Sequence, residues 1–434
     1  MKKIVLKNCR VLNFNQATPY LADIVIDRNG RIEKIIEGRT KISGNYEVID
    51  CHNHYVMPGL INAHSHLFAS GKPFKGNLSP SLKNVGYRLL QTKLGHTALR
   101  MVMHKNAQTQ LQSGITTIRS LGEFFYQDVQ LRDTYLSKKK IGPTLQVAGF
   151  FLSITDGHGA PYLALESDSP WEGRQNVRKN LKQNVDWIKI CVTGGVTDAV
   201  RIGEAGSLQF TEEEITAICE EAHKVGRMVS AHVESTEGVR IALRAGVDSI
   251  EHGSPMDEEI IELYKNNPKS YRGYTTLVPT FQAAAPFALL EQEKTGVSTV
   301  TLENGKIVYE GMLESLHQAI EHGISIGSGN DASMSFVTHY DYWRELDHFV
   351  RYGGMTTRQA LEIGTIGNAK LLGIEEEYGS IEVGKMADLI VLSENPLKEM
   401  RALTSVEMVF KEGQLVKKKE VKKYPKIDQL LNSY

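Results

Sequence analysis

The sequence predicts an α/β fold: a (β/α)8 barrel that carries a small β domain. From about residue 56, eight short apolar runs alternate with helix-period segments, which favours a barrel over an open doubly wound sheet. These runs are continuous and β-branched, as parallel strands buried on both faces require. The two chain ends instead carry short strand patterns. We therefore expect the barrel at 57–375 and one composite β domain at 1–56 and 376–434.

At the N-terminus, residues 4–14 and 23–36 alternate like strands, and Arg28-Asn29-Gly30 interrupts the second as a hairpin turn. At the other end, residues 379–392 and 407–416 are expected to be strands that pair with the N-terminal ones. The basic segment 417–426 is expected to be a solvated surface.

The strongest helix signal is the capping box formed by Thr211 and Glu214, which is followed by an apolar stripe. The shortest repeating unit runs from His232 to His252, with a helix at 237–245 that Gly246 ends. Two more helical patterns cover 340–352 and 357–372. The expected barrel strands are 56–66, 115–121, 145–152, 187–192, 228–233, 249–252, 277–281 and 324–327.

Composition is that of an ordinary globular protein, with 41% hydrophobic and 23% charged residues among 434. The net charge of −1 gives no reason to expect a nucleic acid or a membrane surface as a partner, so we expect a small-molecule substrate. The first residues lack the apolar core of a signal peptide, and the four cysteines form no CxxC pair. We therefore expect a reduced, cytoplasmic protein.

Polar residues stand where barrel strands end, which is where barrel enzymes place their catalytic groups. His64 and His66 close the first strand and point to one face, because strand side chains alternate. Each such residue has an ordinary structural explanation by itself, but neutral imidazole and carboxylate together are the usual ligands of zinc and related ions. The joint pattern predicts a metal site built from His64, His66, Lys189, His232, His252 and Asp331.

Three motifs carry a family resemblance: PGLINAHSH at 58–66, AGVDSIEHG at 245–253 and GKMADLIV at 384–391. The chain resembles the metal-dependent amidohydrolases, in the branch that includes imidazolonepropionases and cytoplasmic Xaa-Pro and Xaa-Arg/Lys dipeptidases. The resemblance implies an amidohydrolase barrel with a side β-sandwich and a homo-oligomeric assembly. It also places Asp331 as a metal ligand and as the catalytic proton shuttle.

Lys189 separates two subtypes of this resemblance. In binuclear members a lysine on the fourth strand is carboxylated by CO2, and its carbamate bridges two metals; mononuclear imidazolonepropionases and deaminases lack it. Here Lys189 lies before TGGV at 193–196, as in the dipeptidase branch. The resemblance thus implies two divalent ions, with zinc expected and manganese or cobalt also accepted by these ligands. His64, His66 and Asp331 would hold one ion, His232 and His252 the other, and the carbamate both.

The implied reaction is hydrolysis of a peptide-like C–N bond, in a dipeptide or an N-acyl amino acid, by a metal-activated hydroxide. The alternative is a structural Lys189 and a mononuclear site that acts on a cyclic amide or an amine. A scaffold that has lost catalysis is disfavoured, because every expected ligand is present.

Recognition of the substrate is less clearly encoded. In related dipeptidases, a histidine at the position of His158 contacts the substrate, and we expect the same here. Arg119 could face a substrate carboxylate or pair with Glu123. Several dipeptidases also have a tyrosine two residues after the fifth-strand histidine, where this chain has Glu234. Since Glu234 disfavours a substrate carboxylate, the preferred group stays open between a basic and an uncharged one.

Overall fold

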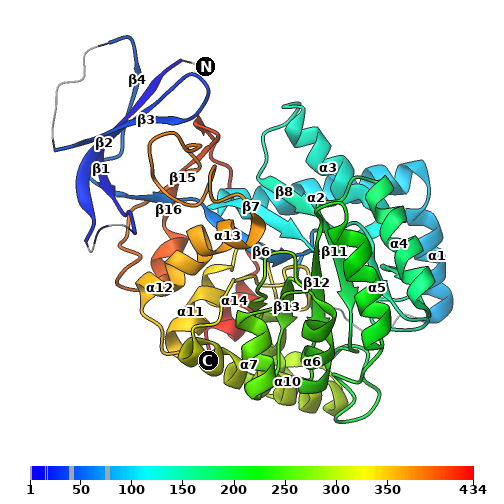
Figure 1. The fold of residues 1–434 in the computed structure, drawn as a ribbon. Coiled ribbons are helices and arrows are strands. Elements are labelled where there is room, and N and C mark those ends of the chain that lie inside the picture. The colour runs from blue at the N-terminus through cyan, green and yellow to red at the C-terminus, as the bar shows by residue number, and fades with distance from the viewer. Residues whose placement is uncertain (1, 15, 17, 39–43, 74–78) are drawn as a thin grey trace.

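The computed structural model describes residues 2–14, 16, 18–38, 44–73 and 79–434, and its centre is a parallel barrel (Figure 1). Adjacent barrel strands pair in parallel, and β10 (Ala164–Glu166) extends the sheet beside β9. The barrel strands are β6 (Leu60–Ser65), β7 (Ile115–Ser120), β8 (Thr144–Val147), β9 (Phe151–Ser153), β11 (Trp187–Cys191), β12 (Met228–Val233), β13 (Ser249–His252) and β14 (Thr276–Val278).

The third and eighth predicted barrel strands differ from regular strands. The third is broken at Gly149, whose φ is +67°, so that its first half pairs with β7 and its second half with β11. The eighth is an extended segment in which Ile326 forms an isolated parallel bridge with Leu277. Further along, Ala332 bridges Ser65 in parallel. This segment therefore closes the ring between β14 and β6, as a TIM-type barrel requires.

The prediction of one strand over 56–66 was wrong. Residues Tyr55–Pro58 form β5, which pairs antiparallel with β15 (Leu389–Leu392) outside the barrel, whereas β6 begins at Leu60. Gly59 lies between them, and a Cβ there would lie 2.2 Å from the Thr116 hydroxyl oxygen. The absence of a side chain at Gly59 thus lets the chain pass directly from the terminal sheet into the barrel.

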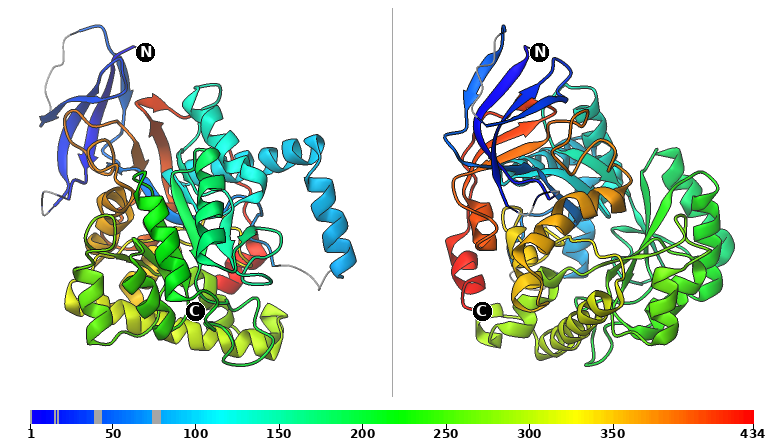
Figure 2. Two further views of the ribbon diagram at one scale, coloured as in Figure 1. Left: turned by 45° about the vertical axis from the view of Figure 1, so that its right-hand side comes forward. Right: turned by 60° about the vertical axis from the view of Figure 1, so that its left-hand side comes forward.

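The two chain ends form one sheet, in which the blue and the orange strands lie side by side (Figure 2). The predicted hairpin is confirmed, since β2 and β3 pair antiparallel. The strand order is β17-β16-β15-β5-β1-β2-β3, with β4 beside β1. The bounds are β1 (Ile4–Val11), β2 (Tyr20–Ile26), β3 (Ile32–Glu37), β4 (Glu47–Asp50), β16 (Val406–Lys411) and β17 (Gln414–Leu415).

The helices cover the outside of the barrel, and the capping box of Thr211 and Glu214 is present at the start of α5. The predicted helix at 357–372 is interrupted by a π-helical turn at 363–367, and the predicted seventh strand ends at Val278, so that Phe281 begins α8. No described helix is both long and apolar enough to cross a membrane. The helices are α1 (Pro80–Leu90), α2 (Lys93–Gln112), α3 (Gln127–Leu136), α4 (Pro170–Lys182), α5 (Glu212–His223), α6 (Thr236–Ala245), α7 (Glu258–Lys265), α8 (Phe281–Leu289), α9 (Gln292–Thr295), α10 (Thr299–His322), α11 (Trp343–Arg351), α12 (Thr357–Glu362), α13 (Asn368–Leu372) and α14 (Pro425–Leu431).

Candidate active site

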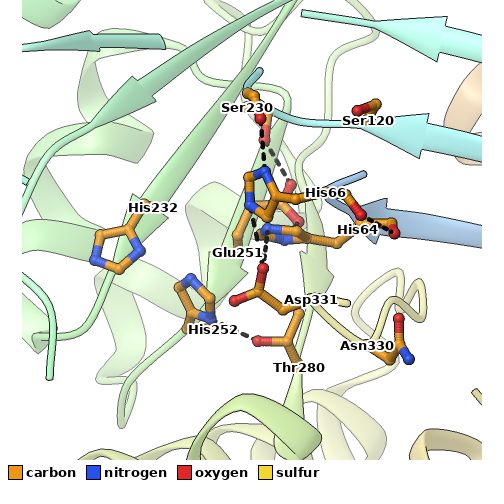
Figure 3. Close-up of polar contacts among 12 residues, drawn as sticks. His64, His66, Ser120, Ser230, His232, Glu251, His252, Thr280, Asn330 and Asp331 are labelled. Carbon is orange, nitrogen blue, oxygen red and sulfur yellow. Dashed lines mark hydrogen bonds and ion pairs between the residues drawn. The ribbon is translucent and has the colours of Figure 1, made fainter. Parts of the chain in front are cut away.

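The six predicted ligands meet at the carboxyl ends of the barrel strands, where they line a single cavity of about 150 Å³. His64 lies near the end of β6 and His66 directly follows that strand; Lys189 lies on β11, and His232 and His252 lie on β12 and β13. Asp331 follows the segment that closes the barrel. All six residues are buried. Figure 3 shows the four imidazoles and Asp331 gathered around one space.

The ligand atoms fall into two groups, each within 4.8 Å. The first contains His64, His66 and Asp331; the Asp331 Oδ1 lies 3.4 Å from His64 Nε2 and 3.2 Å from His66 Nε2. The second contains His232, His252 and Glu234, a residue that had not been predicted as a ligand. The rings of His64 and His252 connect the two groups, with centroids 5.4 Å apart.

Three of the four imidazoles are oriented by a hydrogen bond between Nδ1 and an oxygen atom. His64 Nδ1 meets Glu251 Oε2 at 2.8 Å, His66 Nδ1 meets the Gly122 carbonyl at 2.8 Å, and His252 Nδ1 meets the Thr280 hydroxyl at 2.5 Å. The Glu251 carboxylate and the Gly122 carbonyl can only accept, so they leave Nε2 of His64 and of His66 as the nitrogen with a free lone pair. Outer partners of this kind fix the tautomer and the ring orientation of metal-binding histidines.

Glu251 is the centre of a buried polar network inside the barrel. Its Oε1 accepts hydrogen bonds from Arg119 Nη2 at 2.8 Å, from Ser230 at 2.7 Å and from Ser249 at 2.6 Å, while Oε2 meets His64. Arg119 and Glu251 are both fully buried. Neither alternative considered for Arg119 was right, because it contacts neither the cavity nor Glu123 but neutralises Glu251.

The pKa values of the cluster suit cation binding. Burial lowers the pKa of His64, and lowers those of His232 and His252 well below the ordinary value, so these imidazoles are neutral and able to ligate a metal. Burial raises the pKa of Asp331, but contacts with His64 and His66 outweigh that effect, and the net pKa is lowered. Asp331 is therefore a carboxylate at neutral pH.

The environment of Lys189 shows whether the cluster is suited to two divalent ions and a carbamate. Its Nζ is buried and has no hydrogen-bond partner among the described residues, and burial lowers the pKa of the amine. An unpartnered polar atom in such a place is costly unless another group completes it. A neutral amine is also the form that reacts with CO2. The donor set and the unpartnered amine thus fit divalent ions and a carbamate.

Two residues of the cluster have left-handed backbone conformations, with φ of +73° at His252 and +56° at Asp331. Glu251 and His252 are consecutive, and strict strand alternation would send them to opposite faces. The conformation of His252 explains how both side chains face the interior. Such strain in residues other than glycine is concentrated at functional sites.

His158 lies in the loop after β9, and its ring stacks on that of His232 with centroids 4.2 Å apart and an interplanar angle of 10°. Its Nδ1 contacts the carboxylate of Asp198, which also accepts a hydrogen bond from the Gly195 amide. Burial lowers the pKa of His158, but Asp198 outweighs this and the net pKa is raised. His158 therefore lines the cavity beside the cluster of His64, His66, His232, His252 and Asp331.

Sequence reasoning missed Glu251, Thr280 and Asp198. Glu251 stands directly before His252, and the presence of a carboxylate within a predicted barrel strand was the available signal. Thr280 and Asp198 lie in loops, where no regular spacing in the sequence marks them as site residues.

Together the fold and the site define a parallel α/β-barrel enzyme whose strand ends carry a buried cluster of histidines and carboxylates. The chain belongs to the amidohydrolase family, because the model of that family matches residues 55–416. It is thus a hydrolase of the amidohydrolase superfamily.

Three similar proteins show where this chain stands within the family. A solved structure of a candidate prolidase from Bifidobacterium longum is 40% identical and covers 100% of this chain and 98% of its own, with a TM-score of 0.88. A Xaa-Pro dipeptidase with methionine bound in its active site is 29% identical and covers 95% and 99%, with a TM-score of 0.81. Among characterised proteins, the ochratoxinase of Aspergillus niger is 26% identical over 390 residues, covering 83% of this chain and 75% of the relative.

Proposed function

We propose that this chain is a metal-dependent hydrolase of peptide-like C–N bonds, acting on a dipeptide or an N-acyl amino acid. The observation that carries the proposal is the buried, unpartnered Lys189 amine within a set of four buried histidines and an aspartate. The likeness to a Xaa-Pro dipeptidase supports a dipeptide-like substrate.

In this proposal His64, His66 and Asp331 would hold one divalent ion and His232 and His252 a second, with a carboxylated Lys189 as a further ligand. When bound, the ions lower the pKa of a water molecule and polarise the substrate carbonyl. Zinc is the expected metal.

The remaining chemistry belongs to side chains of the protein. The Asp331 carboxylate accepts the proton of the attacking water and delivers it to the leaving nitrogen, first as general base and then as general acid. Glu251 and Thr280 hold the rings of His64 and His252 in place. His158, which Asp198 orients, contacts the bound substrate.

A library of dipeptides and N-acyl amino acids, assayed with zinc-loaded protein and with protein stripped by a chelator, tests this function. We expect cleavage of at least one amide that is lost on stripping and restored by metal. Release of ammonia without cleavage of any library member, or opening of a cyclic imidazolone, would favour the mononuclear alternative instead.

Three further features remain proposals about the whole molecule. They are the division of the chain at 56/57 and 375/376, a β-sandwich built on the terminal sheet, and a homo-oligomeric assembly. The pairing of β5 with β15 supports the composite terminal domain. Exposed apolar side chains on α1 and α2, namely Leu82, Val85, Leu89, Leu94 and Met101, support the assembly.

A further inference from the structure

Glu234 is a buried carboxylate at the mouth of the cavity for which the proposed mechanism has no use. It follows β12 two residues after His232, and so its side chain points to the same face of the strand. The side chain is 8% exposed and lines the cavity. Its Oε2 is buried without a hydrogen-bond partner among the described residues. An ionised oxygen in this position is strongly disfavoured unless something else pairs with it.

The backbone of Glu234 is held from two sides. Its amide donates to the Thr193 hydroxyl at 3.0 Å. On the other side Gly206 packs so closely that a Cβ there would lie 2.5 Å from the Glu234 carbonyl oxygen. The carboxylate is therefore placed beside the cavity before any ligand arrives, as specific binding requires.

No described lysine or arginine pairs with Glu234, and its Oε2 is left without a hydrogen bond. Within the described part of the chain, the one group at salt-bridge distance is His232, whose Nε2 lies 3.9 Å from Glu234 Oε1. That nitrogen also meets the Gly194 carbonyl at 3.4 Å, so Nδ1 is the nitrogen left for a metal. Glu234 thus approaches the side of the ring that faces protein oxygens, which favours a role toward the substrate over one as a ligand.

The rest of the cavity lining offers a substrate no further free positive charge. Among its described lining residues, Lys189 is the single lysine or arginine, and it lies with the metal ligands. His158 is already paired with Asp198. A wall of the cavity is apolar and is formed from α8 and α10 by Phe287, Val308 and Met312. The described lining thus offers a substrate cation a carboxylate, and offers a substrate carboxylate no free lysine or arginine.

We propose that Glu234 is a specificity-determining residue that binds a positively charged group of the substrate. The enzyme then prefers amides that carry an ammonium or guanidinium group in one half and an apolar group in the other. This inference rests on the proposed amide hydrolysis and narrows its substrate class.

Matched dipeptides test the inference. Leu-Lys against Leu-norleucine, and Lys-Leu against norleucine-Leu, differ by the charged group while keeping an apolar chain of similar length. Charge-assisted hydrogen bonds at buried sites predict that wild type prefers the lysine member of at least one pair by tenfold or more in kcat/KM. Glu234→Gln should abolish this preference mainly through KM. Glu166→Gln, at an exposed carboxylate on β10, should keep it.

Two further readouts separate the alternatives. Metal content should be unchanged in Glu234→Gln, and loss of one metal equivalent would assign Glu234 as a ligand and overturn the inference. Equal cleavage of charged and uncharged members by wild type would overturn the inference while leaving amide hydrolysis intact. If no dipeptide and no N-acyl amino acid of the library is cleaved, the proposed function fails. Calorimetric titration of the metal-loaded protein with lysine and with norleucine then decides the subsite alone: tighter lysine binding that Glu234→Gln abolishes supports it, and equal binding refutes it.

Discussion

The Glu251 carboxylate lies 2.8 Å from Nδ1 of His64 and, through its other oxygen, 2.8 Å from Nη2 of Arg119. A fully buried ion pair seldom adds stability over apolar packing of the same volume. Its role here is explained by the third partner, since the ionised Glu251 directs the proton of His64 to Nδ1 and leaves Nε2 for the ligand cluster. Burial raises the pKa of Glu251, but Arg119 and His64 outweigh it and hold the pKa well below the ordinary value.

Replacing Glu251 by glutamine should therefore weaken metal binding without removing any ligand. Outer partners of metal-bound histidines change affinity by about 10- to 100-fold, and we expect the zinc dissociation constant, measured by competition with a chromophoric chelator, to rise by that factor. Glu345→Gln is a matched control, since Glu345 is equally buried but accepts hydrogen bonds from the amides of Phe281 and Gln282.

Because Glu251→Gln leaves Arg119 as an unpaired buried cation, the variant should also lose stability. A double variant that adds Arg119→Met removes both charges and separates this loss from the loss of metal affinity. Zinc affinity equal to that of wild type in both variants would show that Glu251 does not position His64.

Asp331→Asn should abolish proton transfer while keeping an oxygen near His64 and His66. General acid–base groups contribute about 10²- to 10⁴-fold to rate, and we expect kcat, per bound metal, to fall within that range. The measurement is steady-state hydrolysis of the best library substrate alongside metal analysis of the same samples. Activity per metal that stays at the wild-type value would remove Asp331 from the shuttle role.

Asp128 should make the stability of the protein depend on pH. Burial raises its pKa to about 6, although the amides of Val129 and Gly149 donate to the carboxylate and oppose the shift. Since the folded pKa exceeds the unfolded value of 3.8, the folded state binds the proton more tightly. The contribution to the free energy of unfolding is thus greatest below the unfolded pKa and is lost as the pH rises through about 6.

Between pH 5 and 7.5 this loss amounts to about 1 kcal/mol. Urea unfolding of wild type and Asp128→Asn at both pH values measures it as the difference between the two pH dependences. Identical pH dependences would mean that Asp128 does not titrate in this range. Any constant offset from the altered hydrogen bonds cancels in the comparison.

Much of the barrel and the convergence of the six site residues could be predicted from the sequence, because strand ends and periodicity are local properties. His64, His232 and Asp331 each follow an apolar run, and the barrel topology brings such positions to one rim. The break at Gly149 and the transition at Gly59 were not predicted. Both depend on which neighbouring strand each half of an apolar segment pairs with. That pairing is decided by closure of the barrel rather than by the local sequence pattern.

The polar network beneath the site could not be predicted from local sequence pattern either. Arg119 was placed near Glu123 by sequence proximity, yet Glu251 is 132 positions away along the chain and meets it across the barrel interior. A charged residue inside a buried strand indicates that a partner exists, but only the closed barrel identifies that partner.

Metal stoichiometry tests the binuclear site most directly. After loading with zinc in bicarbonate buffer and removal of free metal, the wild-type protein should retain two equivalents of zinc per chain, as measured by inductively coupled plasma mass spectrometry. Lys189→Ala, which cannot form the carbamate, should retain one or fewer. Wild type that holds one equivalent or fewer, with an unmodified Lys189, would contradict the two-metal site and return the chain to the mononuclear alternative.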